Sequence, residues 1–253
     1  MPVVLVEKQT PQITVLTLNR PERRNALTIE LMAELAAAIE SAGADPAQRI
    51  VILRGAGKAF CTGLDLGEAV VNDPHRTAES VARVLLAVAE SRLITIAMVH
   101  GAAVAGGAGL MSACDFVIAA ERTRIGYPEV RRGLVASLVM TFLRRQLRER
   151  DLREVLLASE LFEAERAREI GLVNRVVPAA DLETETKKLV SAVLQGGPGA
   201  LANSKRLMEQ LWATSVRQDI ERCLQHHMDA RESAEATEGI AAFNEKRPPN
   251  WAA

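Results

Sequence analysis

The sequence has few aromatic residues and almost no net charge. Phenylalanine, tryptophan and tyrosine make up 3% of its 253 residues, and 31 basic against 32 acidic side chains leave a formal net charge of −1. Stacking on nucleobases needs aromatic faces, and binding to a polyanion or a charged membrane surface needs an excess of one charge. We therefore expect neither nucleic acid nor membrane among its partners.

Cysteine and long apolar runs are also scarce. The cysteines Cys61, Cys114 and Cys223 are odd in number, and none belongs to a C-x-x-C motif. This pattern is typical of reduced thiols and predicts neither a disulfide framework nor a metal site. The N-terminus lacks a signal-peptide pattern, and the apolar region 92–120 is interrupted by His100 and by glycines. We predict a cytoplasmic protein without a membrane span.

What the sequence does contain is enough apolar material for a large core, since 48% of its residues are hydrophobic. Runs rich in strand-forming residues at 3–7 and 13–18, separated by a polar break, predict a hairpin. Further strands are predicted at 49–54, a short apolar run typical of a buried strand, and at 93–99 and 172–177, and a short extended piece at 125–129 ends around Pro128. A helical pattern at 28–43, whose first turn Thr28 can cap, lies between the runs at 13–18 and 49–54. A second helical pattern at 78–90 precedes the strand predicted at 93–99. The alternation predicts an α/β fold.

Beyond residue 138 the sequence becomes mostly helical. Periodic segments occur at 138–149, 151–158, 163–170, 180–195 and 200–232, with a Gly-Gly-Pro-Gly break at 196–199. The amphipathic segments after residue 180 each need a surface on which to bury an apolar stripe, and a subunit interface would supply one. We predict an α/β core at 1–178 and a helical region at 179–253.

A glycine-rich stretch lies at the centre of the predicted core, between Ile94 and Ala120. It holds an apolar run, then small residues including Gly106, Gly107 and Gly109, then a short helical segment and a second strand. A glycine turn that opens a helix presents unpaired N–H groups together with the positive end of the helix dipole. This arrangement favours a developing negative charge.

Six segments resemble, in order and spacing, the crotonase family, also called enoyl-CoA hydratase/isomerase. They are NRPERRNAL (19–27), GKAFCTGLDL (57–66), HGAAVAGGAGLMSACD (100–115), YPEVRRGL (127–134), AREIGLVNRVVP (167–178) and FNEKRPP (243–249). The EVRRGL sequence is most similar to bacterial methylglutaconyl-CoA hydratase-like members.

The resemblance implies a crotonase-like spiral of ββα units with the acyl-CoA site at 1–178 and a trimerisation region at 179–253. It also implies a homotrimer or a dimer of trimers, an acyl-CoA thioester as substrate, and no cofactor or metal.

The motif match assigns an oxyanion hole for the thioester carbonyl to the N–H groups of Leu64 and Gly106. Enolising a thioester puts negative charge on the carbonyl oxygen, and preorganised N–H donors stabilise that charge where it develops. The glutamate of the YPE segment, Glu129, is implied as the acid/base catalyst. In an apolar pocket its pKa would be raised by desolvation, which suits proton transfer near neutral pH.

The resemblance further implies contacts to the substrate or to coenzyme A. The residues are Arg24, Ala26, Phe60, Cys61, Thr62, Gly63, Asp65, Leu66, Gly107, Tyr127, Pro128, Arg132 and Lys246. Arg24 carries forked donors suited to a phosphate. Lys246 matches a family lysine near the nucleotide that a neighbouring subunit often supplies.

Two positions depart from the pattern of related enzymes. Family hydratases carry a second glutamate where this chain has Gly109, and dienoyl-CoA isomerases carry an aspartate where it has Ser137. Two carboxylates can hold and split water, whereas one suffices to move a proton along an acyl chain. We predict a hydratase/dehydratase-type lyase of fatty acid metabolism. A single-glutamate enoyl-CoA isomerase and a non-catalytic acyl-CoA-binding homologue are the alternatives.

Overall fold

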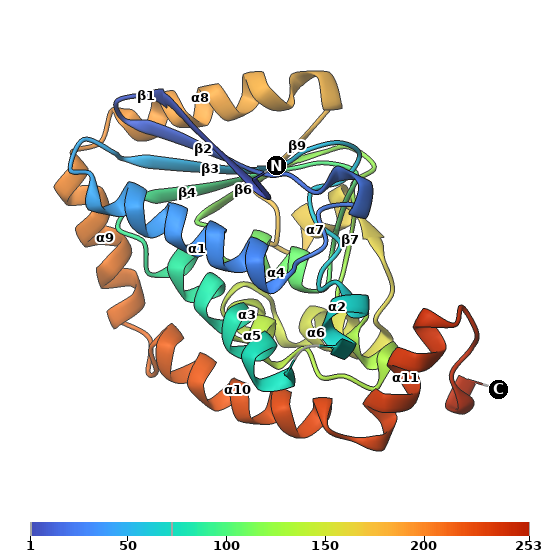
Figure 1. Cartoon of the computed structure of the whole chain (residues 1–253). Coiled ribbons are helices and arrows are strands. Elements are labelled where there is room, and N and C mark those ends of the chain that lie inside the picture. The colour runs from blue at the N-terminus through green and yellow to red at the C-terminus, as the bar shows by residue number, and fades with distance from the viewer. Residues whose placement is uncertain (1, 72, 253) are drawn as a thin grey trace.

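The computed structural model describes residues 2–71 and 73–252, and its centre is a six-stranded sheet (Figure 1). The strands are β1 (Val4–Thr10), β2 (Ile13–Leu18), β3 (Ile50–Gly55), β4 (Ile94–Val99), β6 (Phe116–Ala120) and β9 (Arg175–Val177), in that spatial order. β1 and β2 form an antiparallel hairpin, and every later pairing in this sheet is parallel. All six strands were predicted, β6 as the second strand of the 94–120 stretch; β1 is longer than expected, and β9 shorter.

The two faces of this sheet belong to two different apolar clusters, because alternate strand residues point to opposite sides. Leu16, Val51 and Leu53 pack toward α1 (Ile29–Ala44), α3 (Pro74–Ala89) and α4 (Gly106–Ala113). Ile50 and Ile52 pack with α8 (Leu182–Leu194), which lies along the opposite face in Figure 1. The apolar stripe of α8, for which a subunit interface was one expected partner, is thus buried against the sheet of the same chain.

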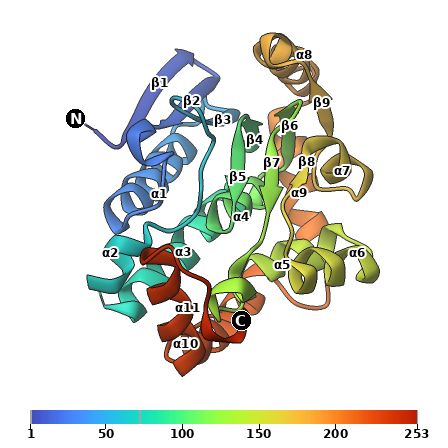
Figure 2. The same cartoon turned by 90° about the vertical axis from the view of Figure 1, so that its right-hand side faces the viewer.

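A second, three-stranded sheet branches from the first and leads to the site. It orders β5 (Ala102–Val104), β7 (Arg124–Gly126) and β8 (Phe162–Glu163), and Figure 2 shows it beside the main sheet. β4 turns into β5 at Gly101, whose φ is +65° and where a Cβ would lie 1.9 Å from the Lys58 carbonyl oxygen. Only glycine fits that approach. The prediction of an extended segment at 125–129 is wrong at its C-terminal end, because Glu129 begins a short 3-10 helix, η2 (Glu129–Arg132).

Helices complete the molecule below the main sheet. They are α2 (Leu66–Val71), α5 (Ser137–Gln146), α6 (Glu149–Arg153), which runs into a π-helical turn at 154–158, α7 (Ala164–Glu169), α9 (Pro198–Gln210), α10 (Val216–Arg231) and α11 (Ala234–Asn244). The single helix expected at 200–232 is two helices, because Ser215 starts α10 with a capping box to Gln218. α10 packs on α3 and α5, and α11 packs on η2 and α2. Among the described residues, no helix combines the length and apolar character needed to cross a bilayer.

Candidate active site

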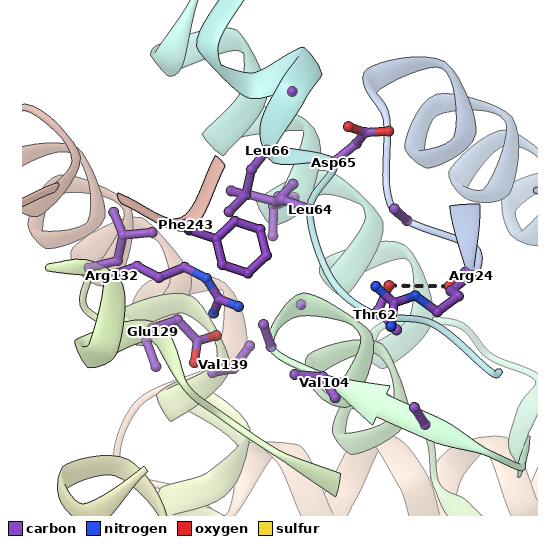
Figure 3. A pocket seen from close by; sticks show the side chains of 18 of the residues that line it. Arg24, Thr62, Leu64, Asp65, Leu66, Val104, Glu129, Arg132, Val139 and Phe243 are labelled. Atoms are coloured by element: carbon purple, nitrogen blue, oxygen red, sulfur yellow. Dashed lines mark hydrogen bonds between the residues drawn. The ribbon is translucent and has the colours of Figure 1, made fainter. Parts of the chain in front are cut away.

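A cavity of about 920 Å³ lies where η2, α2, α4, the first turn of α5 and α11 meet (Figure 3). Of the predicted site residues, Arg24, Ala26, Thr62, Leu64, Asp65, Leu66, Gly106, Glu129, Arg132 and Lys246 line it. These residues come from segments up to about 220 positions apart in the sequence. The fold therefore gathers most of the predicted site into one space.

Two backbone N–H groups, those of Leu64 and Gly106, lie close together in this cavity. Leu27 forms a parallel bridge with Leu64, donating to the Gly63 carbonyl (2.8 Å) and accepting from the Asp65 N–H (2.9 Å). This bridge leaves the Leu64 N–H outside the ladder, and a Cβ built on Gly106 would lie 4.0 Å from the Leu64 nitrogen. Within residues 2–71 and 73–252, neither N–H has a hydrogen-bond partner.

The backbone before Gly106 explains the direction of its N–H. Ala105, the N-cap of α4, has φ +51° and ψ −127°, a conformation that a non-glycine residue rarely adopts. Its own N–H donates to the Gly126 carbonyl, and a Cβ on Gly107 would lie only 2.3 Å from the Cys61 carbonyl oxygen. Close backbone packing thus holds the start of α4 against the loop that carries Leu64.

The Glu129 side chain points into the cavity from the start of η2 (Figure 3). Its Oε2 atom is enclosed and has no hydrogen-bond partner among the described residues. Burial raises the pKa of this carboxyl from 4.5 to about 7, although its own backbone N–H and the charge of Arg132 partly oppose the rise. Glu129 can therefore both accept and return a proton near neutral pH.

No side chain fits at Gly109, on the helix that starts with Gly106. A Cβ there would lie 2.4 Å from Cγ1 of Val139, which fills the space from α5. The other described acids lining the cavity are Glu22 and Asp65, and Asp65 is paired with arginines of the 20–24 loop. Among the lining residues described, Glu129 is thus the one acid with an enclosed, unpartnered oxygen.

Arg132 lies beside Glu129, and within the part of the chain that the structure describes its contacts do not include a salt bridge. Its guanidinium stacks 4.3 Å from the centre of the Phe243 ring, and Nη1 donates to the Pro128 carbonyl at 3.4 Å. Its Nε is enclosed without a partner among the described residues, and desolvation lowers its pKa. Arg132 places a positive charge at the same end of the cavity as Glu129 (Figure 3).

The opposite end of the cavity holds the residues expected near coenzyme A. The Thr62 hydroxyl donates to the Arg24 carbonyl at 3.4 Å, and both lie away from Glu129 in Figure 3. Arg24 at this end and Lys246, which also lines the cavity, are among the cationic side chains available to an anionic ligand.

Six predicted contact residues do not line the cavity: Phe60, Cys61, Gly63, Gly107, Tyr127 and Pro128. The side chains of Phe60, Cys61 and Tyr127 are fully buried in the core behind it. Burial raises the pKa of the Cys61 thiol to about 12, so this cysteine is protonated and inert at neutral pH. The Tyr127 hydroxyl pairs with the Ser112 hydroxyl at 2.8 Å. These residues shape the site through packing and backbone position.

Four further residues contribute to the site. Phe243, His227 and Ser137 line the cavity. The sequence singled out Ser137 only as a departure from the dienoyl-CoA isomerase pattern and Phe243 only as the first residue of the FNEKRPP segment, and no local pattern marks His227. Asn25 is fully buried with φ +55°, and its amide donates to the Ala59 and Phe60 carbonyls. Asparagine tolerates this left-handed backbone and commonly bonds nearby carbonyls, so its place in NRPERRNAL was the available signal.

Two glycines let α11 dock directly on the turn that carries Glu129. A Cβ on Gly133 would lie 2.3 Å from the Glu235 carbonyl carbon, and one on Gly239 would lie 2.4 Å from the Arg132 carbonyl carbon and oxygen. Because the nearest atoms belong to the backbone of Glu235 and Arg132, they cannot make room for a side chain without moving the helix or the turn. The position of η2 therefore depends on α11.

Gly239→Ala is expected to separate α11 from η2. Overpacking at such contacts costs about 1–3 kcal/mol, so we expect a lower melting temperature and a lower kcat. The matched control is Gly43→Ala in α1, where a Cβ would meet nothing within 4 Å. Alanine there should leave the protein at least as stable, because it reduces the freedom of the unfolded chain. Equal melting temperatures of the two variants would contradict the docking role.

Among the described residues, no cluster of three or more His, Cys, Asp or Glu side chains is arranged to hold a metal ion.

Comparisons with known proteins agree on one family. The family model described as enoyl-CoA hydratase/isomerase matches residues 8–253. A putative enoyl-CoA hydratase of Thermus thermophilus is 38% identical over 98% of this chain and all of its own length. A crotonyl-CoA hydratase of Syntrophomonas wolfei is 32% identical over 98% of this chain and 97% of its own. The crystal structure of a putative enoyl-CoA hydratase from Mycobacterium avium paratuberculosis superposes with a TM-score of 0.88, at 35% identity over 99% of each chain.

Proposed function

The chain belongs to the enoyl-CoA hydratase/isomerase family, and on that premise we propose that it adds water to a 2-enoyl-CoA thioester or removes it from the 3-hydroxyacyl product. One observation carries the proposal. The enclosed, unpartnered carboxylate of Glu129 shares a cavity with the two unpaired N–H groups of Leu64 and Gly106. A proton-transfer group and an anion-stabilising pair are what the reaction requires.

In the proposed reaction, the thioester carbonyl oxygen accepts hydrogen bonds from the Leu64 and Gly106 N–H groups. Water bonds to C3 while the Glu129 carboxylate takes one of its protons. The electron pair of the C2=C3 bond moves toward the carbonyl and forms an enolate, whose charge the two N–H groups stabilise. Glu129 then returns the proton to C2. The steps use only residues of this chain and the substrate, so we propose that no cofactor takes part.

We propose that the cationic residues at the other end of the cavity bind coenzyme A. Arg24 lies at that end, Lys246 also lines the cavity, and arginine and lysine suit phosphate groups. The apolar segment of the cavity between them and Glu129, lined by Leu64, Leu66 and Val104, suits the pantetheine and acyl chain. The acyl-CoA thioester is therefore the substrate class that we propose.

The pH dependence of hydration tests the role of Glu129. Since hydration begins with Glu129 accepting a proton, and its pKa is about 7, kcat/KM should rise about tenfold per pH unit below 7 and level off above it. Steady-state assays between pH 5 and 9 measure this. A profile governed by a pKa near 4.5, the ordinary value, would contradict the enclosed carboxylate as base.

A panel of CoA thioesters tests the function itself. Wild-type protein is assayed on short, branched and 3-enoyl thioesters, with product identified by mass spectrometry. Hydration of 2-enoyl substrates supports the proposal. Binding of the same esters without turnover of any of them would support a non-catalytic acyl-CoA-binding protein instead.

One observation favours a second candidate, an enoyl-CoA isomerase. Val139 fills the space beside Gly109, so a single carboxylate faces the reacting carbons. A single carboxylate can take the C2 proton of a 3-enoyl-CoA and return it to C4, without any water to hold. Conversion of 3-enoyl to 2-enoyl thioesters by a protein that hydrates neither would establish this candidate.

We also propose a homotrimer or a dimer of trimers assembled through region 179–253. α9 and the residues after it expose Leu207, Met208, Leu211 and Trp212 to solvent, and such apolar patches mark interaction surfaces. Light scattering should give a mass of three or six chains, and a monomer would contradict the proposal. The cysteines are unpaired, which suits the reducing cytoplasm that we propose as its location.

A further inference from the structure

Three enclosed polar atoms without partners among the described residues belong to side chains that line the cavity. Among the residues that the structure describes, four buried side-chain atoms lack a hydrogen bond, and three of them are Glu129 Oε2, Arg132 Nε and Ser137 Oγ. All three residues line the cavity. Leaving a buried polar group unpaired is unfavourable, so such groups indicate a ligand or water that pairs with them. Three such atoms on the lining of one cavity point to a bound oxygen there.

Ser137 is placed to contact that oxygen. It is the first residue of α5 and is 3% exposed, and its neighbours Ala136, Leu138 and Val139 also line the cavity. α5 spans ten residues, and its N-terminus has no side-chain cap. The positive end of a helix dipole favours an electron-rich atom. A hydroxyl can accept or donate a hydrogen bond, whereas Arg132 Nε can only donate.

Hydration requires water to be held at two points, so that its lone pair faces C3 while a proton faces the base. Glu129 supplies one point. Asp65 is paired with arginines, and Val139 excludes a side chain at Gly109. His227 lines the cavity from α10, but neither ring nitrogen is an enclosed atom without a partner. Ser137 Oγ is therefore the enclosed acceptor left for the second hydrogen of the water.

We propose that Ser137 holds the attacking water together with Glu129 and so performs a task that would otherwise need a second carboxylate. This inference rests on the proposed hydratase function. One water hydrogen passes to Glu129 as the oxygen bonds to C3, and Glu129 returns it to C2. The other hydrogen stays on the oxygen, bonded to Ser137 Oγ, and becomes the hydroxyl hydrogen of the product. In dehydration the Ser137 hydroxyl donates to the departing oxygen.

The test separates water addition from enolisation. Wild type, Ser137→Ala and a control are assayed for hydration of crotonyl-CoA and for exchange of the C2 hydrogens of butyryl-CoA in deuterated water. Exchange needs Glu129 and the two N–H groups but no attacking water. Thr141→Val is the matched control, since it removes a buried hydroxyl from the same helix, outside the cavity lining.

Ser137→Ala is expected to lower the kcat of hydration by about tenfold to a hundredfold, because one hydrogen bond and the orientation of the water are lost. Its exchange rate should stay within about twofold of wild type, since the proton-transfer chemistry is intact. Thr141→Val should keep the wild-type ratio of the two activities.

Three outcomes would overturn the proposal. Wild-type hydration by Ser137→Ala would show that the hydroxyl holds no water, with the hydratase function left standing. An equal loss of hydration and exchange would assign Ser137 to folding or acyl placement. Exchange without any hydration by the wild-type protein would overturn both this inference and the proposed function.

Discussion

Glu129→Gln is expected to lower kcat for hydration by about 10²–10⁴-fold, the contribution of a positioned general acid–base group. Glutamine keeps the size of the side chain and its hydrogen-bonding ability but cannot take up and return a proton. Steady-state kinetics on the best 2-enoyl-CoA substrate measures the loss, and the residual activity should no longer change with pH around 7. Unchanged turnover would overturn the role of Glu129.

The same variant is expected to be more stable than wild type above pH 7. The pKa of Glu129 is raised from 4.5 to about 7 in the folded protein, so the folded state binds this proton more tightly than the unfolded state. Below pH 4.5 both states are protonated and the free energy of unfolding is unaffected. Between pH 4.5 and 7 the unfolded state releases this proton while the folded state still holds it, so the free energy of unfolding falls, by about 3 kcal/mol at most, and it levels off above pH 7 where both states are ionised.

Melting temperatures at pH 4.5 and pH 8 separate loss of chemistry from loss of folding. Glutamine should match wild type at the lower pH and exceed it at the higher one. A variant that melts earlier than wild type at pH 8 would show that its lost activity has a structural cause.

Gly106→Pro is expected to lower kcat by about 10²–10³-fold through loss of one N–H donor to the developing oxyanion. Gly106 is the first residue of α4, the helix position where proline is best tolerated because its N–H has no helical partner. The substitution therefore removes the donor with limited cost to the helix. Binding of a saturated acyl-CoA, measured by calorimetry, should change much less than kcat.

Gly106→Ala is the matched comparison. Its Cβ would lie 3.2 Å from Cδ1 of Leu27, the end of a flexible side chain, and the N–H remains. Alanine should therefore retain far more activity than proline. If both variants lose activity equally, the space at this position matters and the donor does not. Melting temperatures of both are needed because proline also restricts Ala105.

The main sheet was predictable because its signal is local. Residues 50–53 are all apolar, residues 13–18 are apolar apart from Thr14 and Thr17, and alternate residues face two different covered sides, so each strand shows as a short, mostly apolar run. The helix at 28–43 was equally visible, since Thr28 caps it and accepts from the Leu31 N–H. α2 was missed because its six residues are too short for a periodic pattern.

The chemistry of the site was less predictable because it depends on distant contacts. The family motif located Leu64, Gly106 and Glu129, and the structure adds that all three line one cavity. That Val139 occupies the space at Gly109 follows from the packing of α5 on α4. A pair of segments 30 residues apart shows no such contact in the sequence.

The contact between η2 and α11 has a consequence for biosynthesis. Glu235 and Gly239, whose backbone braces the turn that carries Glu129, are synthesised about 100 residues after it. A nascent chain can pair β1 to β6 and bury most of its core before α11 leaves the ribosome. At that stage the turn at 129–132 still lacks its contacts with α11. We therefore expect the sheet to form before the site is complete, because the turn at 129–132 gains its contacts with Glu235 and Gly239 only after α11 has been synthesised.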